Sequence, residues 1–243
     1  MATDMYYGLL DFFTLHPDLA GRELYLSGES YAGKYLPYLA THILNQSHTS
    51  LNLQGILLGN GWVDPPTIVS SYPEWSYAHG LVSTNQLNVL RQNRTDFQTA
   101  LKAGKLSLAT DIEHGMEASV EKWSGMNAYD IRVQGGYDFS NIETFLNQPA
   151  VQQSLGVNRT FAISSSHVGA ILHEDIVKSA IDLIGPLLDL TLDPDHPLWI
   201  NFYTGIFDMD CNIQAHLSWL SKVVWAGQQV EQTHSVVDIS FDN

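Results

Sequence analysis

Apolar residues fall into short runs of strand length that alternate with stretches of helical spacing. Four ranges read as strands: residues 23–27, 53–58, 199–203 and 236–241. Four ranges read as helices: residues 1–13, 31–43, 171–188 and 217–224. Because strands separated by helices pair through crossovers, the pattern predicts an α/β fold with a parallel sheet.

A long polar stretch of helical character separates the second and third strand runs. It opens with Ser83-x-x-Gln86, a capping-box signature in which each side chain bonds a backbone N–H at the helix start. Strand signals are absent from there to about Trp123. The stretch is either an insertion outside the core or a plain helical layer on the sheet.

A serine lies between small residues where the first predicted strand turns into a helix. Residues 28–33 read Gly-Glu-Ser-Tyr-Ala-Gly, with Ser30 at the turn. Such a turn lifts a hydroxyl clear of the sheet in a nucleophile elbow, and only small neighbours let strand and helix pass so closely. Ala32 stands where the usual pattern has glycine. A turn that merely joins two elements is the alternative.

Four segments carry a family resemblance. Residues 28–35, Gly-Glu-Ser-Tyr-Ala-Gly-Lys-Tyr, resemble the active-site signature of the serine carboxypeptidases, α/β-hydrolase peptidases that act at acidic pH. In family order stand Phe-Phe-x-x-His-Pro at 12–17, Gly-Asn-Gly-x-x-Asp-Pro at 59–65, and Phe-Leu-Asn-Gln-Pro-x-Val-Gln, closing on Leu-Gly-Val, at 145–157. Vitellogenic-type carboxypeptidases are the most similar subgroup.

The resemblance implies an α/β-hydrolase fold, with an incomplete parallel-type sheet flanked by helices and a helical cap over the active site. It divides the chain into a core segment with the nucleophile elbow (residues 1–82), a cap insertion (83–130) and a core segment with the acid loop (131–243). The activity that the resemblance implies is hydrolysis of C-terminal peptide bonds, with peptides as substrates.

The same resemblance assigns roles to residues of the catalytic centre. Ser30 would form the acyl-enzyme, and the backbone N–H of Tyr31 would donate to the oxyanion. A catalytic serine needs a histidine as base, and the histidine needs an acid to orient it. In this fold the chain order is serine, then acid, then histidine. Asp208 matches the family's acid in a Gly-x-x-Asp loop after the third strand, and Asp210 is its rival.

Glu29 precedes the serine and by resemblance binds the C-terminal carboxylate of the substrate. A carboxyl donates a hydrogen bond to a carboxylate only while it holds its own proton, which suits activity at acidic pH. The alternative for Glu29 is a buried, hydrogen-bonded structural acid.

Several parts of the family pattern do not occur in this sequence. Only 22 residues precede the first predicted strand, and the Gly-Gly-rich oxyanion loop is absent. The Gly-His-x-x-Pro signature is also absent, while His216 and His234 match no motif. We therefore expect a fragment that lacks both ends and is inactive by itself. The alternatives are a dead remnant that acts at most as a binding module, and an acyltransferase of the same fold.

Composition limits the remaining possibilities. With 44% hydrophobic and 15% charged residues the chain is globular. Its net charge of -15 argues against nucleic acid and suits an acidic compartment or simple solubility. The ten histidines have no metal-ligand spacing, so neither metal nor cofactor is expected. No run is long enough to span a membrane.

Processing signals are few. Cys211 is the one cysteine, so no intrachain disulfide is possible, and a buried apolar role is expected for it. Asn45, Asn93 and Asn158 begin glycosylation sequons. The first 13 residues are not a signal peptide. The resemblance nevertheless implies the secretory pathway, a lysosome or vacuole, or the extracellular space.

Overall fold

The computed structural model describes residues 1–47 and 49–229. Its centre is a parallel sheet in the order β1-β2-β3, formed by β1 (Glu23–Glu29), β2 (Asn52–Gly59) and β3 (Trp199–Tyr203). These strands confirm three predicted ranges, although β1 continues two residues further, up to the elbow. The predicted strand at residues 236–241 lies outside the described residues.

The described helices confirm the predicted alternation with strands. They are α1 (Ala2–Leu15), α2 (Ala32–Leu44), α3 (Pro65–Ala78), α4 (Thr84–Lys102), α5 (Leu106–Ser124), α6 (Ser140–Leu146), α7 (Pro149–Ser154), α8 (Ser166–Leu172), α9 (Ile181–Asp189) and α10 (Ile213–Leu220), with 3-10 turns η1 (His173–Asp175), η2 (Leu190–Leu192) and η3 (Ala226–Gln229). None of the described helices is long and apolar enough to cross a bilayer.

Two predicted helices are corrected. The range 171–188 is not one helix, because the chain leaves helical geometry between η1 and α9, and the Ala180 N–H donates instead to the Val63 carbonyl at 2.8 Å. The range 217–224 begins earlier, at Ile213, because the Asn212 side chain accepts the Ala215 N–H and caps α10 there.

The hydrophobic core begins where α2 covers the sheet and continues into α3, α4 and α5. Leu39 and Ile43 of α2 are buried with Ile56 and Leu58 of the central strand β2. Helices α1 and α9 both contact α2. The edge strand β3 is open by comparison, and its Trp199 side chain is 71% exposed.

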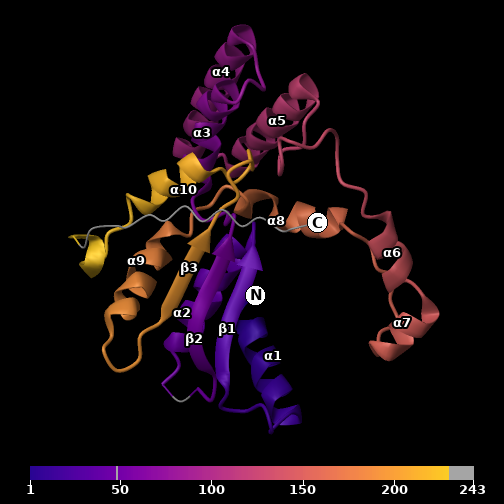
Figure 1. Cartoon of the computed structure of the whole chain (residues 1–243), viewed down its shortest axis with the longest axis vertical. Coiled ribbons are helices and arrows are strands. Elements are labelled where there is room, and N and C mark those ends of the chain that lie inside the picture. Colours follow the sequence, from indigo (N-terminus) through magenta and orange to yellow (C-terminus); the bar gives the residue numbers. More distant parts are fainter. Residues whose placement is uncertain (48, 230–243) are drawn as a thin grey trace.

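A helical layer stands beyond the carboxyl ends of the strands, where the arrowheads of Figure 1 point toward α3, α4, α5 and α10. The predicted capping box at the start of α4 is confirmed, since Ser83 and Gln86 exchange backbone and side-chain hydrogen bonds. Helix α4 contacts α3 and α5, and α3 also contacts α10. The proposed boundary at residue 83 falls between α3 and α4 and remains a prediction.

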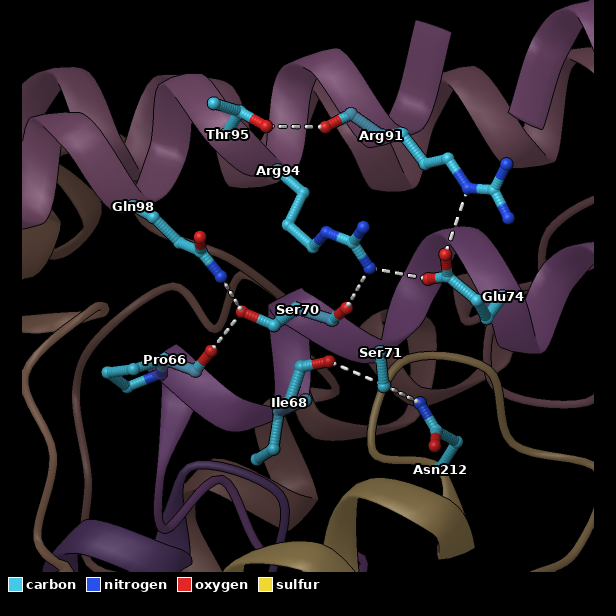
Figure 2. A network of polar contacts seen from close by, with 10 residues as sticks. All are labelled: Pro66, Ile68, Ser70, Ser71, Glu74, Arg91, Arg94, Thr95, Gln98 and Asn212. Carbon is cyan, nitrogen blue, oxygen red and sulfur yellow. Dashed lines mark hydrogen bonds and ion pairs between the residues drawn. The ribbon is translucent and has the colours of Figure 1, made fainter. Parts of the chain in front are cut away.

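Polar contacts join α3 to α4 and to the loop before α10 (Figure 2). Glu74 of α3 pairs with Arg91 at 3.0 Å and Arg94 at 2.6 Å. The Asn212 amide donates to the Ser71 hydroxyl at 2.7 Å. Exposed ion pairs contribute only about 0–1 kcal/mol each, so these contacts mainly fix how the helices align.

We predict that Gly33→Ala destabilises the fold, because a Cβ there would lie 2.5 Å from the Trp62 backbone nitrogen, which cannot move as a flexible side chain does. The expected loss in free energy of unfolding is about 1–3 kcal/mol, measured by urea denaturation. Gly115→Ala in α5 is the control, because open space surrounds that position. It should raise stability by up to about 1 kcal/mol. Equal stability of the two variants would contradict the packing described for the elbow.

Candidate active site

Ser30 occupies a strained turn at the carboxyl end of β1. Its φ is 56°, in the left-handed region that residues with a Cβ rarely adopt, at a cost of about 1–3 kcal/mol. Backbone hydrogen bonds hold the turn in place. The Ser30 N–H donates to the Gly59 carbonyl at 3.1 Å, and the Ser30 carbonyl accepts the Gly33 and Trp62 N–H groups, both at 2.8 Å. This geometry is that of the predicted nucleophile elbow.

Asn60 joins the ends of β2 and β3. Its backbone N–H donates to the Tyr203 carbonyl at 2.9 Å, and its side-chain oxygen accepts the Gly205 N–H at 3.2 Å. Its amide nitrogen donates to Oδ2 of Asp208 at 2.5 Å. The residue before Asn60, Gly59, accepts the Ser30 N–H through its carbonyl. The elbow and the acid loop therefore meet at the carboxyl ends of the three strands.

The two candidate acids of this loop have different surroundings. Asp208 is buried and accepts the Cys211 N–H at 3.0 Å in addition to the Asn60 amide. Burial and the nearby charge of Asp210 raise the pKa of Asp208 to about 7, against the lowering effect of those hydrogen bonds. Asp210 points instead toward the helical layer, where it accepts the Tyr72 hydroxyl at 2.5 Å. The contacts with Asn60 therefore favour Asp208 as the acid of the site.

The family resemblance implies roles for the two residues that flank the serine, Glu29 and Tyr31. Glu29 is exposed at the end of β1, which disagrees with the alternative of a buried structural acid. It lies close enough to Asp210 for its charge to raise the pKa of that carboxyl, after the larger effect of burial. The Tyr31 N–H donates no hydrogen bond within residues 1–47 and 49–229, so it is available to a ligand.

A contact that the sequence did not reveal holds the start of α2 in place. The Tyr31 hydroxyl donates to Asp175 Oδ2 at 2.5 Å, and Lys34, which is 3% exposed, donates to the same oxygen at 2.9 Å and to the Asp175 carbonyl. Partial burial opposes ionisation of Asp175, but the hydrogen bonds from Tyr31 and Lys34 outweigh it and lower its pKa. Asp175 is about 140 positions away in the chain, so no local pattern marks it.

The described structure assigns no base to Ser30. His216 is 4% exposed inside α10, its Nδ1 lies 3.2 Å from the Asn212 carbonyl, and burial lowers its pKa. No histidine within the described ranges forms a hydrogen bond to Ser30 or Asp208. His234 lies outside these ranges.

The remaining predicted sites differ in exposure. Cys211 is buried and free as expected, but its surroundings are not purely apolar, because its thiol donates to Asp210 Oδ2 at 3.8 Å. Asn45 and Asn158 are exposed, whereas Asn93 is half-buried in α4. Glycosylation at all three remains a prediction.

Comparisons with known proteins agree with this arrangement. A profile of the family described as "Serine carboxypeptidase" matches residues 1–239. The chain is 31% identical to a "Serine carboxypeptidase-like" protein of Oryza sativa subsp. japonica, over 100% of the chain and 59% of the relative. It is 30% identical to "Probable serine carboxypeptidase CPVL" of Dictyostelium discoideum, over 100% of the chain and 50% of that relative.

A solved structure shows the same fold. The crystal structure of Kex1(delta)p, a prohormone-processing carboxypeptidase from Saccharomyces cerevisiae, matches with a TM-score of 0.75 and 23% identity, over 93% of this chain and 54% of that one. The match confirms the predicted α/β-hydrolase fold. The chain spans about half the length of the curated relatives it matches. The vitellogenic-type subgroup remains a prediction.

The profile match extends across nearly the whole chain, and it agrees with the elbow at Ser30 and the Asp208 loop at the carboxyl ends of the strands. The chain therefore belongs to the serine carboxypeptidase family.

Proposed function

We propose that the protein carrying this chain is a serine-type carboxypeptidase that removes C-terminal residues from peptides through an acyl-enzyme on Ser30. The observation that carries the proposal is the connection between the two reacting elements. Ser30 lies in a strained elbow, and its N–H donates to the Gly59 carbonyl. The residue after Gly59 is Asn60, whose side-chain amide donates to Asp208 at 2.5 Å.

In the proposed reaction, Ser30 Oγ attacks the carbonyl carbon of the last peptide bond while its proton passes to a histidine. Asp208 orients that histidine, which the described residues do not supply. The oxyanion of the tetrahedral intermediate accepts a hydrogen bond from the Tyr31 N–H. Collapse of the tetrahedral intermediate breaks the C–N bond, and the histidine gives its proton to the departing amino group. Water, deprotonated by the same histidine, then hydrolyses the ester and regenerates Ser30.

Glu29 gives this site its preference for a free C-terminus. It lies next to the nucleophile in the sequence and is exposed at the strand end, where a substrate can reach it. A carboxyl that retains its proton donates a hydrogen bond to the substrate's terminal carboxylate. An amidated or internal peptide bond offers no carboxylate at that place.

Two other functions follow from the same fold. An acyltransferase would pass the acyl group from Ser30 to an alcohol instead of water, and recognition of a carboxylate by Glu29 argues against it. A binding module without catalysis fits the described ranges, in which no histidine contacts Ser30. Release of a C-terminal amino acid from a blocked dipeptide at about pH 5 supports the peptidase, and binding without release supports the module.

By analogy with the family, we place the protein in the secretory pathway, a lysosome or vacuole, or outside the cell. The exposed sequons at Asn45 and Asn158 suit glycosylation there.

Replacing the reacting groups tests the mechanism in the enzyme that contains this chain. Ser30→Ala should abolish release of C-terminal residues. Asp208→Asn should lower kcat by on the order of 10⁴, because the base then loses its orientation and counter-charge. Asp210→Asn is the matched control and should retain most activity. If Asp208→Asn retained normal turnover while Asp210→Asn lost it, the role of the acid would belong to Asp210.

Asn60 is proposed as a positioning residue for Asp208. Asn60→Gly tests this, because glycine adopts the observed φ of 41° without strain and removes only the side-chain contacts. We expect kcat to fall about tenfold or more, with KM nearly unchanged, since both polar atoms of the Asn60 side chain are already bound within the protein, to Asp208 and Gly205. A parallel rise of KM with unchanged kcat would show that Asn60 shapes the binding site instead.

The role of Glu29 is tested by comparing peptides with free and amidated C-termini. Glu29→Ala should raise KM for the free peptide by roughly tenfold or more, the effect of losing one charge-assisted hydrogen bond. KM for the amidated peptide should change much less. Glu29→Gln keeps a donor and should lose less than Glu29→Ala. Equal losses on both peptides would assign Glu29 a structural role.

A further inference from the structure

Three carboxylates meet where the acid loop touches the helical layer. Glu113 and Glu117 lie one turn apart on α5, so both project from the same face of that helix. Asp210 reaches them from the loop after β3. One oxygen from each of the three lies within 4.8 Å of the others. Below, these residues are called the carboxylate cluster.

The cluster has an unpartnered acid at its centre. Glu113 is 2% exposed, and its Oε2 accepts no hydrogen bond from any described residue. The nearest basic group is His114, with Nε2 at 3.5 Å from that oxygen. A buried carboxylate without a partner is costly, and this one therefore calls for a ligand.

His114 is the one basic side chain that the described residues place within 4 Å of a cluster carboxylate. In the part of the chain that the structure describes, no lysine or arginine forms an ion pair with any of the cluster's three members. The other charges acting on it are acidic: Glu121, Asp208 and Glu29. Either protons or a cation must balance these charges.

We propose that Glu113, Glu117 and Asp210 bind a divalent cation of the Ca²⁺ type. All three ligands are carboxylate oxygens, the donors that Ca²⁺ takes at 2.3–2.6 Å as a general rule. Two oxygens on opposite sides of such an ion lie roughly 4.6–5.2 Å apart, so the observed spacing of up to 4.8 Å leaves room for it. The Cys211 thiol donates to Asp210 Oδ2 at 3.8 Å.

The bound cation would fasten the acid loop to the helical layer. Asp210 is already oriented by the Tyr72 hydroxyl of α3 at 2.5 Å, and the cation would add a link from Asp210 to α5. Two residues earlier, Asp208 binds Asn60 at the sheet edge. None of the three ligands is assigned a step in the proposed reaction, although the charge of Asp210 acts on Asp208.

The test is calcium binding at pH 8 by the protein that carries this chain, measured by titration calorimetry and by thermal unfolding with and without about 10 mM CaCl₂. The wild type should bind one Ca²⁺ with a Kd on the order of 10⁻⁴ M, and CaCl₂ should raise its Tm. Glu113→Gln and Glu117→Gln should each weaken binding about tenfold or more. Glu174→Gln, an exposed acid outside the cluster, should bind like the wild type.

Unfolding without calcium keeps the test decisive. Each cluster variant replaces a carboxyl group that burial disfavours as an ion with a neutral side chain of nearly the same shape. Its Tm without calcium should therefore equal or exceed that of the wild type, which shows that it folds. Absence of binding heat together with an unchanged wild-type Tm would show that the cluster holds protons, and would overturn the proposal. Wild-type affinity in both glutamine variants would also overturn it, by placing the bound ion elsewhere.

Discussion

The arrangement of the active site depends on the three hydrogen bonds of Asn60. Its backbone and side chain bind Tyr203, Gly205 and Asp208, and so hold the ends of β2 and β3 in one register. The residue before it accepts the Ser30 N–H, which brings the end of β1 to the same place. This position suits asparagine, because the backbone φ of 41° favours residues that tolerate left-handed geometry, and the side chain must both donate and accept.

Local patterns predicted what local forces determine. The runs at residues 53–58 and 199–203, the capping box at Ser83 and the turn at Ser30 were all visible in the sequence, since each depends on neighbours a few positions apart. Contacts between distant segments were not. No sequence pattern near Asp175 predicts its hydrogen bond with the Tyr31 hydroxyl. Similarly, the helical region breaks before α9 because the Ala180 N–H donates to the carbonyl of the distant residue Val63. The carboxylate cluster likewise requires two elements that only the fold brings together.

The acidic residues of this chain differ in whether a cation accompanies them. Asp175 has Lys34 and the Tyr31 hydroxyl beside it, and its pKa falls despite partial burial. Asp208 has hydrogen-bond donors but no cation in the described structure, and burial raises its pKa to about 7. A histidinium beside Asp208 would reverse this shift and ionise it, as the proposed mechanism requires. Surplus negative charge therefore gathers at the strand ends, between the elbow and the helical layer.

The central claim is that the elbow serine is the nucleophile of the site that Asn60 holds together. It is tested most directly by treating the protein with a fluorophosphonate, which labels serines activated by a base, and locating the label by peptide mass spectrometry. The account predicts a single label on Ser30 in the enzyme that contains this chain, and no label when the protein is denatured by heat before the fluorophosphonate is added. A label on another serine, or hydrolysis of peptides by a protein that takes no label, would contradict it.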